Sequence, residues 1–360
     1  MKQPSLPRLA GTLLVATLLG GCANGVPSGT IVPAAGSTGL HQASLPRDAS
    51  WISPGAASAH TLVYVAMNGE GGGGFYGVEI FAWPSLKLVG KIAHYGSVGG
   101  ACSDSKGNVY IILNGYSTST FPAIEKFSHG GKLLSTYTDS NGRPNGCAVN
   151  PQNGDLAVTN FLGLGSCGES CWYPGNLVVY SSPSSPPTVY TNSTEQNYFY
   201  PAYDPAGNLW ETGGDNVGTT WLYSCASGSC NETALSGATI HFPAGLQWVK
   251  SLKSLMIFDA ACNRPSSNSG SCGYLVTSQG VLSSKTTYDN FQGGATCNIG
   301  QAVLAPNGKS VVSGDGETFC GYTPSTLDGW AYPAGGNPAT YHAFKSNYAF
   351  PTGIAFSTKG

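Results

Sequence analysis

Charged residues are scarce in this chain of 360 residues: Lys and Arg number 16, Asp and Glu 18, and together they make up 9% of the sequence. Ordinary globular domains carry about 25%. So few cations exclude an electrostatic nucleic-acid binder, which needs clustered Lys and Arg. The net charge of −2 favours a neutral, polar ligand surface over electrostatic steering of a ligand.

Helix-forming residues are scarce as well, whereas Gly (51), Pro (23) and Tyr (19) are abundant. This composition predicts an all-β fold, because aromatic residues favour strands while Gly and Pro favour turns. A hydrophobic content of 41% and an aromatic content of 11% are too high for a disordered chain.

Residues 1–21 are predicted to be an export signal. Lys2 and Arg8 supply its positive charge. The apolar run that follows, Leu9–Leu19, is too short to cross a bilayer as a helix, which takes about 20 residues. No transmembrane helix is therefore expected at this end of the chain.

The apolar run ends in Leu19-Gly20-Gly21-Cys22, which resembles the lipobox of bacterial lipoproteins. The resemblance implies cleavage before Cys22, acylation of its thiol and new amino group, and a stable membrane anchor of several acyl chains. Because Ala23 stands where Asp would resemble an inner-membrane retention signal, the outer membrane is favoured in a cell with two membranes. An ordinary secretory signal with a chance cysteine is the alternative. Residues 22–57 are rich in Gly, Pro, Ser and Ala and predict a flexible tether ahead of a domain over residues 58–360. Trp51 is the exception in this segment, as a residue that could pack onto the domain.

Ten cysteines remain besides Cys22, and export would place them where disulfides persist. Closeness in sequence suggests the pairs Cys167–Cys171, Cys225–Cys230, Cys262–Cys272 and Cys297–Cys320. The remaining two, Cys102 and Cys147, occupy matching positions in successive repeats. Sequence alone does not prove this connectivity. A zinc site at the first pair would need two further ligands, and no histidine lies near it in sequence.

A repeated segment organises the domain. Copies start at Val98, Pro144, Tyr200, Pro243, Ile299 and Pro351, with spacings of 46, 56, 43, 56 and 52 residues. A complete copy has a strand of small residues, a turn usually closed by Gly, and then a strand of alternating apolar residues. Two more short strands follow in each copy. Periods of about 40–50 residues are typical of propeller blades, so the sequence predicts a six-bladed β-propeller. A two-sheet sandwich would not predict six copies in register.

The sixth copy is divided between the two ends of the domain. Residues 351–360 supply its first strand, and residues 61–69 supply its second, aligning with residues 108–115. We therefore expect one blade to be closed by the N- and C-terminal strands together. Small residues in the first strands, such as Gly100, Gly146 and Gly353, suit strands that crowd around an axis.

The turn motif D-x-x-G-N-[LV]-[YW] occurs at residues 104–110 and 204–210. It resembles the repeat of six-bladed propellers of the NHL and SMP-30/gluconolactonase type, in the TolB-like superfamily, and the resemblance covers residues 61–360. SMP-30-like lactonases hold a divalent metal with a Glu, an Asn and an Asp at a channel mouth. The Asn and Asp types have counterparts here, whereas Glu70 lies inside a glycine run and does not match the Glu.

Polar side chains follow the second strand of each repeat. These are Asn68, Asn114, Asn160, Asp215, Asp259 and Asp315. If the loops meet at one channel mouth, their oxygens could form a ring suited to Ca²⁺, another divalent cation or sugar hydroxyls. The alternative is structural, because Asn and Asp favour turns.

The sequence thus favours a membrane-anchored, extracytoplasmic propeller lipoprotein that binds a protein, glycan or peptide without catalysis and without a required cofactor. The alternative is a divalent-metal-dependent lactonase or hydrolase of the SMP-30-like type, with the Asn/Asp ring as ligands.

Overall fold

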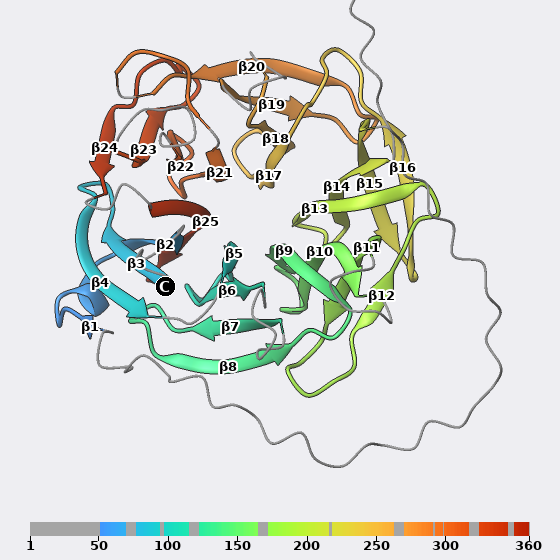
Figure 1. Ribbon diagram of the computed structural model, residues 1–360, viewed down its shortest axis with the longest axis horizontal. Helices are drawn as coiled ribbons and strands as arrows, with labels where there is room; N and C mark the ends of the chain where they lie inside the picture. Colours follow the sequence, from blue (N-terminus) through green and yellow to red (C-terminus); the bar gives the residue numbers. More distant parts are fainter. Residues whose placement is uncertain are drawn as a thin grey trace, which may run out of the picture. The chain divides into compact units, whose positions relative to one another are not determined.

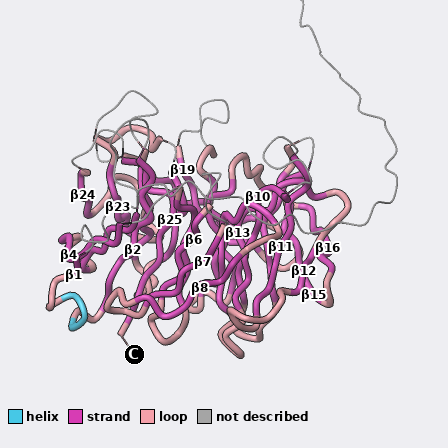
Figure 2. Tube along the Cα trace, turned by 60° about the horizontal axis from the view of Figure 1, so that its bottom comes forward, coloured by secondary structure: helices cyan, strands magenta, loops and turns pink. Residues whose placement is uncertain are grey.

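The computed structural model describes residues 51–69, 77–93, 97–114, 122–164, 172–215, 218–262, 270–290, 292–297, 299–316, 324–344 and 349–359. Within them, six antiparallel sheets surround a central axis as the blades of a β-propeller (Figure 1). The predicted all-β, six-bladed fold is therefore confirmed. Figure 2 shows the same strands in an oblique view, turned by 60° from that of Figure 1.

In every blade the strands follow one another from the axis outward. Blade 1 contains, in that order, β25 (Ala349–Thr358), β2 (Thr61–Gly69), β3 (Gly77–Ala82), β4 (Lys87–Ala93) and β1 (Trp51–Ile52). Blade 2 contains β5 (Val98–Ser103), β6 (Val109–Leu113), β7 (Ala123–Phe127) and β8 (Leu133–Thr138). Blade 3 contains β9 (Gly142–Val149), β10 (Leu156–Leu164), β11 (Trp172–Tyr180) and β12 (Thr188–Tyr190).

The other three blades have four strands each. Blade 4 contains β13 (Glu195–Tyr203), β14 (Leu209–Asp215), β15 (Thr220–Ala226) and β16 (Ser229–Ala234). Blade 5 contains β17 (Pro243–Val249), β18 (Ser254–Asp259), β19 (Ser271–Val276) and β20 (Leu282–Tyr288). Blade 6 contains β21 (Ile299–Leu304), β22 (Ser310–Asp315), β23 (Thr326–Ala331) and β24 (Thr340–Ala343).

Both ends of the folded chain build blade 1, as the divided repeat predicts. Strand β25 pairs with β2 along its whole length, from Thr61 opposite Thr358 to Gly69 opposite Ala349. Side chains of β25 enter the apolar layers on both sides of the blade: Ala355 on one side, and Ile354 and Phe356 on the other. The C-terminal strand is therefore part of the core of the ring.

The folded body begins earlier than the predicted boundary at residue 58. Trp51 and Ile52 pair with Lys91 and Gly90 at the outer edge of blade 1, and a short 3₁₀ helix, Ala56–Ser58, follows. These residues belong to a Gly-, Pro- and Ser-rich stretch, so composition alone assigns them to the tether. The apolar pair Trp51-Ile52 is long enough to add a short fifth strand to an exposed sheet edge.

Apolar layers between neighbouring blades form the core. Leu62, Tyr64 and Ile80 of blade 1, for example, pack in one buried cluster with Val109 and Ile111 of blade 2. A blade buries apolar side chains on both faces only when another blade covers each face. Closing the ring therefore stabilises every sheet in it.

Inner strands approach one another so closely that two positions require glycine. A Cβ atom on Gly353 would overlap Gly99 O and lie 2.7 Å from Gly100 Cα. A Cβ atom on Gly146 would lie 2.7 Å from Phe199 O. Real Cβ atoms do not approach backbone atoms this closely, which explains the small residues predicted for the first strand of each repeat.

The predicted turn motif is a backbone cap. Asp104 Oδ1 accepts hydrogen bonds from the N–H groups of Lys106 and Asn108, each at 2.9 Å. Asp204 makes the equivalent contacts in blade 4. The glycine of the first turn, Gly107, has φ of 77°. Lys253 stands in the glycine position of the fifth repeat and also has a positive φ, 48°.

Three predicted disulfides are present in the described residues: Cys102–Cys147, Cys225–Cys230 and Cys262–Cys272. Cys297 is disulfide-bonded as well. Cys22, Cys167, Cys171 and Cys320 lie outside the described residues. Cys225–Cys230 in blade 4 and Cys262–Cys272 in blade 5, which closeness in sequence suggested, are thus confirmed. Cys102 and Cys147, at equivalent positions of blades 2 and 3, are linked as well.

Candidate functional site

A cavity of about 380 Å³ lies on the propeller axis. Residues from all six blades line it, among them Ala148 of β9, Tyr203 of β13, Trp248 of β17 and Phe356 of β25. A pocket of this size falls in the range that proteins use to bind small ligands or single side chains. It is the candidate binding site of this protein.

The cavity and the predicted Asn/Asp ring lie at opposite ends of the channel. Ring residues pair with the first part of the inner strands: Asp259 faces Pro243, and Asp315 faces Ile299. The cavity is lined by the last residues of those strands, such as Trp248 and Leu304. The sequence predicts which residues follow the second strand of each blade, but it does not predict at which end of the channel the cavity lies.

A glutamine closes the inner end of the cavity. Gln301 Oε1 accepts a hydrogen bond from Ala101 N–H at 2.8 Å, and Gln301 Nε2 donates one to Ala101 O at 2.8 Å. The N–H of Ile354 also donates to Gln301 Oε1, at 3.3 Å. One side chain of blade 6 thereby ties together the inner strands of blades 1 and 2. Sequence reasoning missed this residue, although a lone Gln among the small residues of an inner strand was a visible signal.

The lining of the cavity is almost uncharged. Among the described residues that line it, Asp104 is the single charged one. Burial raises the pKa of Asp104, but its hydrogen bonds with Asn108 and the nearby Lys126 ammonium outweigh burial and hold this pKa below its ordinary value. The indole N–H of Trp248 is buried and has no hydrogen-bond partner among the described residues. The cavity thus offers mainly apolar and neutral polar groups.

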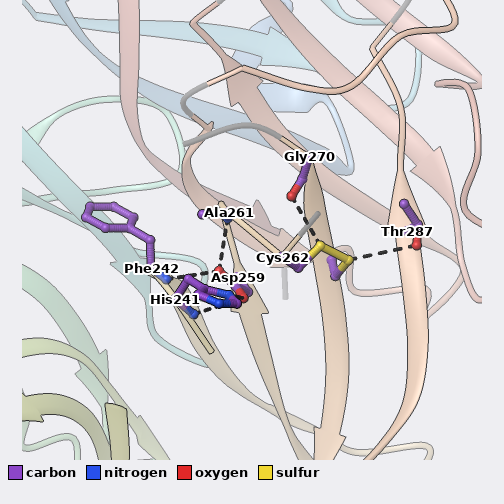
Figure 3. Close-up of polar contacts among 8 residues, drawn as sticks. His241, Phe242, Asp259, Ala261, Cys262, Gly270 and Thr287 are labelled. Carbon is purple, nitrogen blue, oxygen red and sulfur yellow. Dashed lines mark hydrogen bonds and ion pairs between the residues drawn. A yellow bond between two sulfur atoms is a disulfide. The ribbon is translucent and has the colours of Figure 1, made fainter. Parts of the chain in front are cut away.

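Two predicted ring residues hold backbone at the opposite mouth. Asn68 Oδ1 accepts the N–H of Val98 at 2.7 Å, and Asn68 Nδ2 donates to Val98 O at 2.8 Å. Asp259, fully buried, accepts N–H groups from His241, Phe242 and Ala261 at 2.9–3.1 Å (Figure 3). These contacts fix the entry of inner strands β5 and β17.

The other four ring positions differ among themselves. Asp215 caps its own turn by accepting Thr219 N–H at 2.8 Å. Asp315 accepts Cys297 N–H at 2.7 Å, and Asn160 Nδ2 donates to Asn176 Oδ1 at 2.9 Å. The buried Oδ1 of Asn114 has no partner in the described part of the chain. Contacts with backbone explain Asn68, Asp215, Asp259 and Asp315 at these strand ends but not Asn114 and Asn160. The use of the six residues as ligands for a metal or a sugar stays a prediction.

No group of three or more His, Cys, Asp and Glu side chains that could hold a metal ion is found within the described ranges. Glu70, the residue considered as a lactonase-type ligand, lies outside them. In the same described ranges, no helix is long and apolar enough to cross a bilayer.

An arc of three phenylalanines lies near the strand entries at the ring end of the channel. The rings of Phe161 and Phe199 have centroids 5.3 Å apart, and those of Phe199 and Phe242 are 5.9 Å apart. Phe242 is 40% exposed, and its ring points away from the Asp259 contacts (Figure 3). Each phenylalanine belongs to a different blade, so only the closed fold brings them together.

The fold and this geometry define a six-bladed propeller with an axial pocket. No family model and no curated protein sequence matches the chain. Solved structures do resemble it. A chain of the nidogen/laminin complex has a TM-score of 0.59 at 15% identity, covering 83% of this chain and 99% of that one. TolB from Acinetobacter baumannii has 0.55 at 15% identity, covering 85% and 68%.

A protein of unknown function from Bacteroides caccae has a TM-score of 0.55 at 12% identity and covers 82% of this chain and 98% of that one. At such low identity these likenesses show the propeller fold alone.

Proposed function

We propose that this chain is an exported, lipid-anchored propeller that binds a neutral, polar ligand, either a peptide segment of a protein or a glycan, in its axial cavity. The cavity carries the proposal: about 380 Å³ on the axis, with residues of every blade in its wall. Rigid inner strands hold that wall, so little conformational entropy is lost when a ligand enters. The low charge of the chain and of the cavity lining, in which Asp104 is the single charged residue among those described, suits a ligand without charge.

Filling the cavity tests this proposal. Ala148 lines the cavity and is half-buried, so Ala148→Trp would occupy ligand space without opening a blade interface. Wild type and variant are applied to arrays of neutral oligosaccharides and uncharged peptides, and each hit is titrated calorimetrically. We expect Ala148→Trp to lose at least about tenfold in affinity, or about 1.4 kcal/mol.

Ala334→Trp is the matched control, because Ala334 is exposed in an outer turn of blade 6 and the new side chain would face solvent. This control should bind as the wild type does. Equal affinity of the wild type and Ala148→Trp would place the ligand elsewhere on the protein. The array that gives hits distinguishes a glycan from a peptide ligand.

The anchor is tested separately at Cys22. A Cys22→Ser chain lacks the thiol that would be acylated, and we expect it to move from the membrane fraction to the soluble extracytoplasmic fraction. Cell fractionation followed by immunoblotting measures this change, with Ser28→Ala in the same segment as the control. Membrane retention of Cys22→Ser would contradict a lipid anchor at this residue.

A further inference from the structure

Two glutamates lie side by side inside blade 4, away from the axial cavity and close to the predicted ring position Asp215, which pairs with Glu195. Glu195 begins β13 and Glu211 lies in β14, and neither is exposed to solvent. A Cβ atom on Gly213 would overlap Glu195 Oε1 and lie 3.0 Å from Tyr223 Cε2. The Glu195 carboxyl and the Tyr223 ring therefore meet over a glycine, where no side chain separates them.

Several oxygen atoms in this cluster make no hydrogen bond of ordinary geometry. They are both carboxyl oxygens of Glu195, Oε2 of Glu211 and the hydroxyl of Tyr223, all buried in the described part of the chain. The Glu195 carboxyl also interacts with the Glu211 carboxyl and with the Tyr198 hydroxyl. Glu211 Oε1 is engaged, because it accepts Phe199 N–H at 3.0 Å. Buried oxygens without partners cost free energy, so four of them in one cluster call for either protons on the carboxyls or a bound cation.

The charges around the cluster are all negative. Glu195 is under the influence of Glu211 and Glu232, and Tyr223 under that of all three glutamates and Asp215. Two adjacent carboxyl groups in a low-dielectric interior are neutralised either by protons or by a bound cation.

We propose that this cluster is a buried Ca²⁺ site, with the free oxygens of Glu195, Glu211 and Tyr223 as ligands. The donors are all oxygens and two of them are carboxylates, which suits a hard cation and not Zn²⁺ or Cu²⁺. Ca²⁺ accepts irregular sets of carboxylate and neutral oxygens, whereas Mg²⁺ demands near-ideal octahedral geometry. The site has two carboxylates and one phenol. It is therefore not one of the groups of three or more His, Cys, Asp and Glu side chains for which the described ranges were negative.

The site would also order the channel mouth. Glu211 holds the backbone of Phe199, the central ring of the phenylalanine arc. A cation that fixes Glu211 would thereby fix this part of β13. The inference is independent of the ligand proposed for the axial cavity, which lies at the opposite end of the channel.

Calcium titration of the mature protein, stripped with a chelator and dialysed, tests the proposal. CaCl₂ is the probe, binding is measured calorimetrically, and the thermal midpoint is recorded with and without the ion. We expect one Ca²⁺ per chain and a raised midpoint, since an ion that binds only the native state stabilises it. Glu195→Gln and Glu211→Gln, which keep the side-chain shape, should each lose at least about tenfold in affinity.

Glu232→Gln is the matched control, because Glu232 is a nearby but exposed glutamate; it should retain the calcium response. The Gln variants should still fold in chelator, since they remove buried like charges. Absence of binding by the wild type would overturn the proposal, as would Gln variants that bind Ca²⁺ like the wild type. An equal rise of the midpoint with Mg²⁺ would overturn the assignment to calcium.

Discussion

A chain that ends at residue 348 should fail to fold into a cooperative domain. It lacks β25, whose residues Ile354, Ala355 and Phe356 are at most 7% exposed and pack on both faces of blade 1. Each large apolar side chain contributes about 1.5–3 kcal/mol by burial, and the whole backbone pairing with β2 is lost as well. The loss should exceed about 5 kcal/mol, the lower end of the total stability of a typical domain.

Thermal and guanidinium unfolding followed by circular dichroism measure this effect. A chain ending at Thr358 is the matched control, because it loses a single described backbone contact, from Lys359 N–H to His60 O, and should unfold within about 1 kcal/mol of the wild type. A synthetic peptide of residues 349–360 should restore part of the transition. A cooperative, unshifted transition for the chain ending at 348 would show that the ring does not depend on β25.

Loss of the Cys102–Cys147 disulfide should cost about 4 kcal/mol, because it closes a loop with a sequence separation of 45 and so restricts the unfolded chain. It also joins the inner strands of two blades at the wall of the axial cavity. The variant is Cys102→Ala/Cys147→Ala, and its free energy of unfolding is measured in guanidinium without reductant.

The matched control is Cys225→Ala/Cys230→Ala, which removes a bridge with a sequence separation of 5, for which the same chain-entropy argument gives about 2 kcal/mol. Losses of equal size in the two double variants, or a larger loss in the control, would contradict loop closure as the source of stability.

The fold was predictable because each repeat carries its own signals. Turn glycines such as Gly107 and the small residues of the inner strands recur in register, and the divided copy at the chain ends specifies how the ring closes. These features are local, so they can be recognised in a single sequence. The short outer strand Trp51–Ile52 was not predicted, because two apolar residues in a polar, Gly-rich segment form no periodic pattern.

The candidate site was less predictable, because it depends on contacts between blades. The bridge from Gln301 to Ala101 joins residues 200 positions apart, and no periodicity links them. Glu195 and Glu211 are not strand partners, and β13 shifts its register on β14 between Glu195 and Asn197 and again between Tyr198 and Tyr200, which a regular strand alignment does not contain. Side-chain contacts that depend on such register shifts can be identified from the structure but not from the sequence pattern.

The short outermost strand gives blade 1 a particular response to mechanical tension. A load applied along the chain at Trp51 first acts on β1, which is paired with β4 at just two positions and can peel away one residue at a time. The next strand along the chain, β2, is paired with β25 on one side and with β3 on the other. Under shear, most of the backbone hydrogen bonds of β2 must break together. Tension from an N-terminal tether would therefore extend the edge strand before it opened the ring.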